Sequence, residues 1–340
     1  MKETRRPIGR YLAVLAVLVW VWTSASATAD ETEKSKTVKL NCHNDAGKDQ
    51  DAIDKALKKL NPGDTLQLTG TCTAAVTIKN EGITLDGGGN GACGGASGAT
   101  INPSDQSAIA IAVRARDTTI RGLNLTGGDT GIDVAEVALA VVDRNRVYGN
   151  AGNGITVTQV SQAGIINSCF ENNGQEGIMV NDNSSVRVGF LDTDDPAARP
   201  NTIKNNGRDG MRIRRSSNAR VFCNVISNNT VIGASVDRSA HAEFSANTIN
   251  GNGSDGIRVR DNGGVNFGTQ AFSGTCDAPK VPTTFADEAN NTSQPNGTGS
   301  AGGRGLDCRV QGYVEGKLGT LNGAGGATNF AMGCLDNTTP

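Results

Sequence analysis

Charged side chains recur at a fixed spacing in the second half of the 340-residue sequence. Arg214, Asp237 and Arg260 follow one another at intervals of 23 residues, and Arg215 and Arg238 are also 23 residues apart. A repeat of this length indicates a coiled chain in which equivalent positions lie above one another. Successive turns would be about 5 Å apart, so these side chains would crowd one surface. Such a surface suits a carboxylated or sulfated sugar chain, because a guanidinium group can hold a carboxylate by two parallel hydrogen bonds.

Three sets of residues are candidates for function. The candidate substrate-binding residues are Arg212, Arg214, Arg215, Arg238, Arg258 and Arg260. The candidate catalytic residues are Arg214, Arg215 and Arg238, any of which could act as the base, together with Asp237. The candidate calcium ligands are Asp182, Asp237 and Asp261 on this surface, and Asp192, Asp194 and Asp195 in the insertion "GFLDTDDPAARP". Calcium prefers clustered carboxylate oxygens, but a solvated acidic loop is an equal alternative for the insertion, which matches no complete calcium-loop pattern.

The charged surface also has a purely structural interpretation, which we favour. The ion pairs expected on this interpretation are Arg214–Asp237–Arg260, Asp182–Arg215 and Asp261–Arg238. Exposed pairs of this kind are common and contribute little to stability. Glu176, Asp209 and Asp255 each precede a glycine. We interpret these three acids as turn residues.

The elements that position the charged residues follow from a glycine marker with the same period. The markers are Gly131, Gly154, Gly177, Gly210, Gly233 and Gly256, with Ala108 one step earlier. The one interval of 33 residues, from Gly177 to Gly210, contains the ten-residue insertion. Apolar residues one and three positions after each marker predict a short strand with these two side chains inward. The first inward column is Ile109, Ile132, Ile155, Ile178, Met211, Ala234 and Ile257, and the second is Ile111, Val134, Val157, Val180, Ile213, Val236 and Val259.

Two more short strands complete each period. The inward residues expected in the second strand are Val186, Val188, Ala219, Val221, Ala242, Phe244, Val265 and Phe267. Those expected in the third strand are Val147, Phe170, Ile203, Ile226 and Ile249. Asparagine recurs between strands at positions 145, 201, 224 and 247, and again at 150, 173, 206, 229 and 252. We expect tight or left-handed corners at these positions, because asparagine tolerates such backbone.

With three short strands in each repeat, the sequence resembles the right-handed parallel β-helix proteins of the pectin-lyase-like superfamily. The resemblance implies an all-β, single-stranded solenoid with a capping helix at its N-terminal end, and we place the coil at residues 65–272. The segment "DQDAIDKALKKL" carries Ile53, Ala56, Leu57 and Leu60 on one helical face, which suits a cap within residues 30–64. Residues 273–340 are expected to form a glycine-rich loop and a second cap.

Residues 1–29 are expected to be a signal peptide. Basic residues precede an apolar run at 11–22, and small residues of the cleavage-site type follow it. The run is shorter than the about 20 residues that cross a membrane, so we expect no membrane span after its removal. Removal changes the formal net charge from −2 to −5, which makes nucleic acid a poor partner. We expect a monomer that is secreted, periplasmic or otherwise extracellular.

The eight cysteines indicate an oxidising compartment. Cys42 and Cys72 flank the amphipathic segment and are the best disulfide pair. One further bridge is expected among Cys276, Cys308 and Cys334. Cys93 has no obvious partner. Cys169 and Cys223 are expected to be buried, unbridged thiols, because they lie two coils apart and so beyond disulfide reach.

The resemblance implies a uronate polysaccharide as substrate and a base of the Arg, Lys, His or Tyr type, with calcium as the candidate cofactor. The chain has only His43 and His241 and lacks the Gly-His-Gly, Asp-Pro-His and Trp-Ile-Asp-His elements of related enzymes. Its Arg-x-Pro-x-x-Arg string, Arg5 to Arg10, lies in the expected signal peptide. Two functions therefore stay open. One is an enzyme, a lyase or epimerase that binds an anionic polysaccharide; the other is a non-catalytic β-helix that only binds glycan or is a structural module of the cell surface.

Overall fold

A computed structural model of the chain describes residues 35–95, 97–191, 198–268, 296 and 303–339. The expected signal peptide and Cys276 lie outside the described residues, as do the insertion residues Asp192, Asp194 and Asp195. Within the described part, no helix has both the length and the apolar character needed to cross a membrane.

The strands of the described residues form three parallel sheets of twelve, ten and eight strands. The twelve-stranded sheet contains β1 (Thr37–Asn41), β2 (Thr65–Thr69), β5 (Thr84–Asp86), β8 (Thr118–Arg121), β11 (Leu139–Asp143), β14 (Gln162–Ile166), β17 (Ser185–Val188), β20 (Asn218–Phe222), β23 (His241–Ser245), β26 (Gly264–Phe267), β28 (Tyr313–Lys317) and β30 (Leu335–Thr339). The ten-stranded sheet contains β4 (Val76–Ile78), β7 (Ile109–Val113), β10 (Thr130–Val134), β13 (Ile155–Val157), β16 (Ile178–Val180), β19 (Met211–Arg214), β22 (Ala234–Asp237), β25 (Ile257–Val259), β27 (Leu306–Cys308) and β29 (Thr328–Phe330). The eight-stranded sheet contains β3 (Thr71–Cys72), β6 (Thr100–Ile101), β9 (Asn124–Leu125), β12 (Arg146–Tyr148), β15 (Cys169–Glu171), β18 (Thr202–Lys204), β21 (Val225–Ser227) and β24 (Thr248–Asn250).

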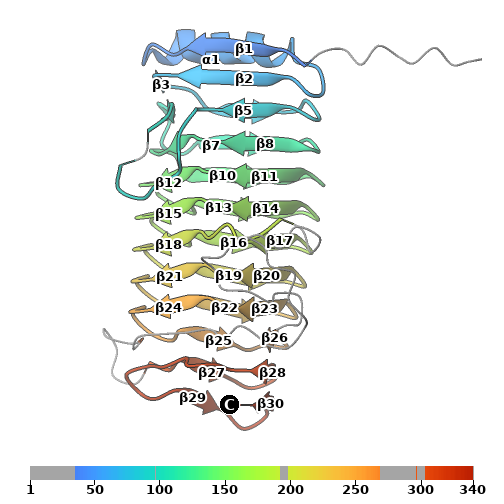
Figure 1. The fold of residues 1–340 in the computed structure, drawn as a ribbon, viewed down its shortest axis with the longest axis vertical. Helices are drawn as coiled ribbons and strands as arrows, with labels where there is room; N and C mark the ends of the chain where they lie inside the picture. Colours follow the sequence, from blue (N-terminus) through green and yellow to red (C-terminus); the bar gives the residue numbers. More distant parts are fainter. Residues whose placement is uncertain (1–34, 96, 192–197, 269–295, 297–302, 340) are drawn as a thin grey trace, which may run out of the picture. The chain divides into compact units, whose positions relative to one another are not determined.

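Each strand pairs in parallel with the equivalent strand of the next coil, and Figure 1 shows the coils stacked one upon another. This is the predicted parallel β-helix. The predicted inward residues of the second and third strands are all buried, which confirms their assignment. One continuous apolar core runs inside the coils.

The first inward column of the ten-stranded sheet has the predicted register from β10 to β25. Its fully buried members are Ile132, Ile155, Ile178, Met211, Ala234 and Ile257. In the preceding coil the prediction is wrong by two residues, because Ile132 pairs with Ile111 and Val134 with Val113. Ile109 pairs with Thr130 instead and is only half-buried. The coil from Ile111 to Ile132 is 21 residues long, so a strict step of 23 misplaces it.

The recurring asparagines form two buried ladders between coils. Asn224 Nδ2 donates to the Val188 carbonyl at 2.9 Å and to Asn247 Oδ1 at 3.1 Å, while Asn201 Nδ2 donates to Asn224 Oδ1 at 2.9 Å. The prediction of left-handed backbone is wrong for these asparagines, because none of them has a positive φ. The left-handed backbone belongs to the preceding residue in most corners, for example Cys223 with φ 62°. The ladder side chains supply hydrogen bonds to backbone that turns inside the core.

The helix α1 (Ala46–Leu57) contacts β1, β3 and β4, and Figure 1 shows it beside β1 at the end of the stack. The side chain of Asp45 caps its first turn. Ile53, Leu57 and Leu60 are buried in the same core as the coil, which confirms the expected helical face.

Two expected disulfides are present. Cys42 and Cys72 are bonded, with Cα atoms 4.8 Å apart. Cys308 and Cys334 are bonded, with Cα atoms 5.9 Å apart, and this pair is the further bridge expected in the C-terminal region. No cysteine in the described part of the chain is free.

The expectations for the other cysteines are wrong. Cys93 is bonded to Cys169, with Cα atoms 5.4 Å apart, and Cys223 is disulfide-bonded as well. After β5, residues 87–95 leave the stack and reach β15, where the Gly94 N–H also donates to Glu171 Oε1 at 2.9 Å. A repeat-based argument misses this bond, because Cys93 lies in a loop outside the repeat.

Candidate functional site

The charged residues lie on the outer face of the ten-stranded sheet. Arg212 pairs in register with Ser235, and Ser235 with Arg258. Arg214 pairs with Asp237. The corner after each of these strands carries the third set of charges at positive φ, namely Asp182, Arg215, Arg238 and Asp261 with φ of 52°, 55°, 57° and 53°. These three columns of side chains are therefore adjacent on one face.

Asp237 is the centre of an ion-pair cluster with three arginines. Arg212 Nη2 donates a hydrogen bond to Asp237 Oδ2 at 3.0 Å, and Arg260 Nη2 lies 3.6 Å from the same oxygen. Arg238 Nε lies 3.7 Å from Asp237 Oδ1. Burial lowers the pKa of Arg212, but the carboxylates of Asp237, Asp209 and Glu176 together outweigh this effect and the net shift is upward. Arg212 therefore takes the place beside Asp237 that we expected for Arg214.

Arg214 makes no ion pair with a carboxylate among the described residues. Its Nε donates to Asn181 Oδ1 at 3.2 Å. Burial and the neighbouring guanidinium groups of Arg212, Arg215 and Arg238 lower the pKa of this side chain. The Asp237 carboxylate acts in the opposite direction but does not outweigh these effects, so Arg214 is a guanidinium group among like charges with no carboxylate in direct contact in the described part of the chain.

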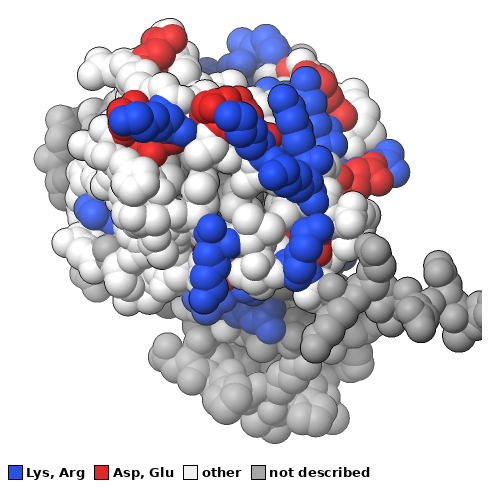
Figure 2. Space-filling view, turned by 90° about the horizontal axis from the view of Figure 1, so that it is seen from above, with Lys and Arg blue, Asp and Glu red and all other residues white. Residues whose placement is uncertain are grey.

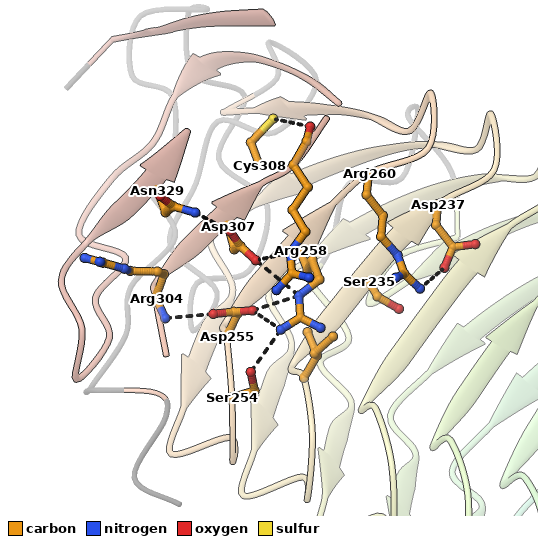
Figure 3. A network of polar contacts seen from close by, with 12 residues as sticks. Ser235, Asp237, Ser254, Asp255, Arg258, Arg260, Arg304, Asp307, Cys308 and Asn329 are labelled. Carbon is orange, nitrogen blue, oxygen red and sulfur yellow. Dashed lines mark hydrogen bonds and ion pairs between the residues drawn. The ribbon is translucent and has the colours of Figure 1, made fainter. Parts of the chain in front are cut away.

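Arg258 is held between two buried carboxylates, as Figure 3 shows. Its Nε and Nη2 both donate to Asp255 Oδ2, with Nε at 2.8 Å, and its Nε lies 3.3 Å from Asp307 Oδ2 in the next coil. Burial alone would raise the pKa of Asp307, but hydrogen bonds from Asn329 and Arg309 make the net shift downward. Arg258 is therefore already neutralised by the acids around it.

The acids that we interpreted as turn residues do lie outside the strands, directly before the corner glycines, but their side chains also belong to this face. Glu176, Asp209 and Asp255 are all buried. Asp209 Oδ2 accepts a hydrogen bond from Ser235 Oγ at 2.7 Å, and Asp209 Oδ1 accepts one from the Ile232 N–H at 3.2 Å. Burial raises the pKa of Asp209, and the nearby Glu176 carboxylate raises it further.

A repeated sequence pattern could have indicated that two of these acids lie close to arginines of this face. Asp209 to Arg212 and Asp255 to Arg258 repeat the pattern Asp-Gly-apolar-Arg. Glu176 lacks an arginine three positions later and is instead 3.6 Å from Arg212 of the next coil. Neither carboxylate oxygen of Glu176 has a hydrogen-bond partner. Arg208 Nε also lies 3.9 Å from Glu176 Oε1, so ion pairs with two arginines stabilise this buried acid.

The pairs at the corner are exposed. Arg215 Nη1 lies 3.3 Å from Asp182 Oδ1, as the structural interpretation expected. Asp261 is 3.7 Å from Arg260 Nε, so Arg260 takes the place expected for Arg238. Seen from the end that carries β1, acidic and basic groups lie side by side between wide uncharged areas (Figure 2).

The calcium ligands expected on this face are not gathered into a metal-binding group. In the described ranges, the one cluster with three potential ligand atoms is Cys93, Cys169 and Glu171, and its two sulfurs form a disulfide. Asp182 and Asp261 both lie at the corners beside arginines. Their nearest charged partners are therefore cationic groups of the protein.

Comparison with known structures shows the same fold in three polysaccharide-active proteins. An alginate lyase from Paenibacillus sp. str. FPU-7 is 15% identical with a TM-score of 0.58, and the match covers 90% of this chain and 99% of that one. The pectate lyase Pel9A is 13% identical with a TM-score of 0.60, covering 90% of this chain and 78% of that one. The A-module of the mannuronan C-5 epimerase AlgE4 from Azotobacter vinelandii is 15% identical with a TM-score of 0.50, covering 89% of this chain and 95% of that one.

At sequence identities of 13–15%, the similarity to these structures shows that the chain shares their fold. No curated protein is detectably similar to the chain in sequence. The sequence pattern described as "Right handed beta helix region" matches residues 81–189 and 188–296. These segments cover more than half of the chain, and their described residues include the strands β5 to β26 of the stacked coils. The chain therefore belongs to the right-handed β-helix family.

Proposed function

We propose that the chain binds an anionic polysaccharide on the outer face of the ten-stranded sheet. The binding residues in this proposal are Arg214, Arg215, Arg238 and Arg260. The environment of Arg214 is the main support for this proposal. Its side chain is half-buried among other arginines and makes no ion pair with a carboxylate in the described part of the chain. A uronate or sulfate group would supply the missing negative charge. Arg212 and Arg258 do not belong to the binding set, because buried acids already neutralise them.

The spacing of the binding residues suits a polymer. Arg215 and Arg238 occupy equivalent corners of successive coils, and Arg260 follows one coil later. Successive coils are about 5 Å apart, so a sugar chain that runs along the stack would meet one guanidinium group in each coil. Arg238 and Arg260 keep 49% and 38% of their side-chain surface exposed. Both can therefore turn toward a ligand from their shared partner.

The lowered pKa of Arg214 favours a second, catalytic candidate. A base must be deprotonated to accept a proton, and a lower pKa reduces the cost of forming the neutral side chain. In this candidate reaction Arg214 takes the proton next to a uronate carboxylate. The electron pair forms a carbon–carbon double bond, and the glycosidic oxygen leaves. A lyase of this kind releases an unsaturated sugar that absorbs ultraviolet light.

We also propose that the chain is exported. The disulfides fit an oxidising compartment, and an extracellular polysaccharide is accessible to an exported protein. The similar structures, named for alginate, pectate and mannuronan, supply the test polymers.

Affinity chromatography on immobilised alginate and polygalacturonate tests the binding proposal. We expect the wild-type protein to be retained and to elute with salt, because exposed charge contacts are screened over about 8 Å at physiological ionic strength. Arg214→Ala should elute at lower salt. Arg220→Ala is the matched control: it removes the same charge from a residue of the twelve-stranded sheet and should elute like the wild type. Equal shifts in both variants would mean that net charge, rather than this site, causes retention.

The catalytic candidate is tested by ultraviolet absorbance during incubation with the same polymers. We expect absorbance to rise with the wild-type protein and not with Arg214→Ala. Retention on the polymer without any rise in absorbance would leave binding as the function and remove Arg214 as a base.

A further inference from the structure

A hollow of about 650 Å³ lies on the outer face of the twelve-stranded sheet, over β23, β26, β28 and β30. These strands are neighbours in that order at the C-terminal end of the stack (Figure 1). The strand register places His241, Gly264, Tyr313 and Leu335 in one outward column of successive coils. A volume of this size is within the range of small-molecule sites.

Gly264 is the residue that keeps the hollow open. A β-carbon at this position would lie 2.8 Å from Cδ2 of His241 and 3.7 Å from Cδ1 of Tyr313, so the nearest atoms belong to the two rings and not to the backbone. The neighbouring Gly263 differs, because its β-carbon would collide with the Val236 carbonyl oxygen at 2.5 Å. The φ angle of Gly264 is also outside the left-handed region. Neither the backbone conformation nor a close backbone contact therefore requires glycine, and glycine in a strand often marks the approach of a ligand.

The chemistry of the lining is that of a neutral, partly apolar ligand. Among the described residues, no Asp, Glu, Lys or Arg lines the hollow. Its aromatic surface comes from Tyr313 and His241, and polar side chains come from Ser239, Asn262 and Gln311. A hexose ring has an apolar face that can pack on an aromatic ring and hydroxyl groups that can bond to amides and hydroxyls.

The ring of Tyr313 is held in place from outside the hollow. Its hydroxyl donates a hydrogen bond to Glu315 two residues later on the same strand. Fixing the phenol in this way reduces the entropy lost when a ligand packs against it.

The hollow adjoins the proposed binding face at the corner between the two sheets. Arg238 lies at the corner of the ten-stranded sheet, and the next residue, Ser239, lines the hollow. Asp261 and Asn262 are related in the same way one coil later. A glycan that runs along the stack at this corner has arginines on one side and uncharged groups on the other.

We infer that this hollow binds a neutral sugar ring of a polysaccharide whose uronate groups lie on the proposed binding face of the ten-stranded sheet. Tyr313 is the stacking surface, and Gly264 leaves the space that the ring enters. The inference rests on the proposed function and narrows its substrate to a heteropolymer of charged and neutral sugars.

Tyrosine fluorescence can report on this site. After residue 29 the chain contains no tryptophan and only two tyrosines, Tyr148 and Tyr313. A protein of residues 30–340 retains every described coil and the whole described core. The probes are gellan oligosaccharides, which contain glucuronate and neutral sugars, and oligogalacturonate, which contains uronate alone. We expect gellan oligosaccharides to change the fluorescence of the wild type and of Tyr148→Phe, and to leave that of Tyr313→Phe unchanged.

Binding constants from calorimetry complete the test. Tyr313→Ala should bind gellan oligosaccharides roughly tenfold more weakly and oligogalacturonate as the wild type does. Gly264→Val should weaken gellan binding similarly while keeping Tyr313, and circular dichroism checks that both variants are folded. If the wild type binds oligogalacturonate and Tyr313→Ala leaves gellan affinity unchanged, the inference is overturned and the proposed function stands. Equal weakening of both probes also overturns it, whereas a wild type that binds neither probe refutes the proposed function and the inference together.

Discussion

Replacing Asp237 by Asn removes the central charge of the arginine cluster and keeps the size of the side chain. The Asp237 side chain is 1% exposed and Arg212 is 12% exposed, so their 3.0 Å pair is shielded from water. The contacts of Arg260 and Arg238 are longer, and these side chains are far more exposed, so water screens them and they contribute little. Removing one partner of a buried pair costs about 3–5 kcal/mol. Because Glu176 remains 3.6 Å from Arg212, we expect a loss at the lower end, about 3 kcal/mol.

Thermal unfolding followed by circular dichroism measures this loss. At roughly 2 °C for each kcal/mol in a chain of this size, the melting temperature of Asp237→Asn should fall by about 6 °C. The same variant should be retained more strongly on polygalacturonate, because Arg238 and Arg260 lose their shared partner. Asp182→Asn is the matched control, since it removes an equal charge from the same face. Its pair with Arg215 is exposed on both sides, so stability should change by less than about 1 kcal/mol while retention still increases.

Two outcomes would refute this reasoning. An unchanged melting temperature for Asp237→Asn would mean that the buried pair contributes no stability. Unchanged retention of both variants would mean that the arginines of this face do not hold the polymer.

Two further predictions concern groups buried beside or between the coils. Asn224→Ala leaves the Asn201 N–H and the Val188 carbonyl without their partner; at about 1–3 kcal/mol for each buried group, urea unfolding should show a loss of about 2–6 kcal/mol. Asn218→Ala, on the exposed outer face of β20, should stay within about 0.5 kcal/mol of the wild type. The pKa of Asp209 is raised in the folded state by burial, so folding takes up a proton and stability falls as pH rises above the ordinary value of 3.8. Asp209→Asn should remove this fall, so that the variant gains stability relative to the wild type between pH 4 and pH 7; a constant difference across that range would contradict the assignment.

Much of the fold could be predicted because buried positions are occupied by apolar residues at regular intervals along the sequence. Side chains of a strand alternate between core and surface, and equivalent strands recur with each coil. The column from Ile132 to Ile257 follows from these two periods alone. The prediction fails at Ile109, because the coil that follows it is two residues shorter than the 23-residue period and Ile111 therefore takes the first inward position. Both residues are isoleucine, so the sequence alone gives no sign of the shorter coil.

The sequence predicted which charged residues share a face, but not which side chains contact one another. The repeat placed Arg212, Arg214 and Asp237 on one face, whereas side-chain packing decided that Arg212 contacts Asp237 while Arg214 keeps no carboxylate partner among the described residues. Glu176 and Asp209 were missed because an acid before a glycine has the same sequence pattern in an exposed turn and in a buried one.

The sequence by itself determined the repeat, the inward faces, the helical face of α1 and the pairing of Cys42 with Cys72, because each depends on residues that are close in the chain or related by the period. Only the tertiary structure decided the bond between Cys93 and Cys169, the partner of each arginine and the open space above Gly264. These features depend on the path of a loop outside the repeat and on the directions of side chains in neighbouring coils. A one-dimensional period fixes which residues are neighbours, but not which atoms meet.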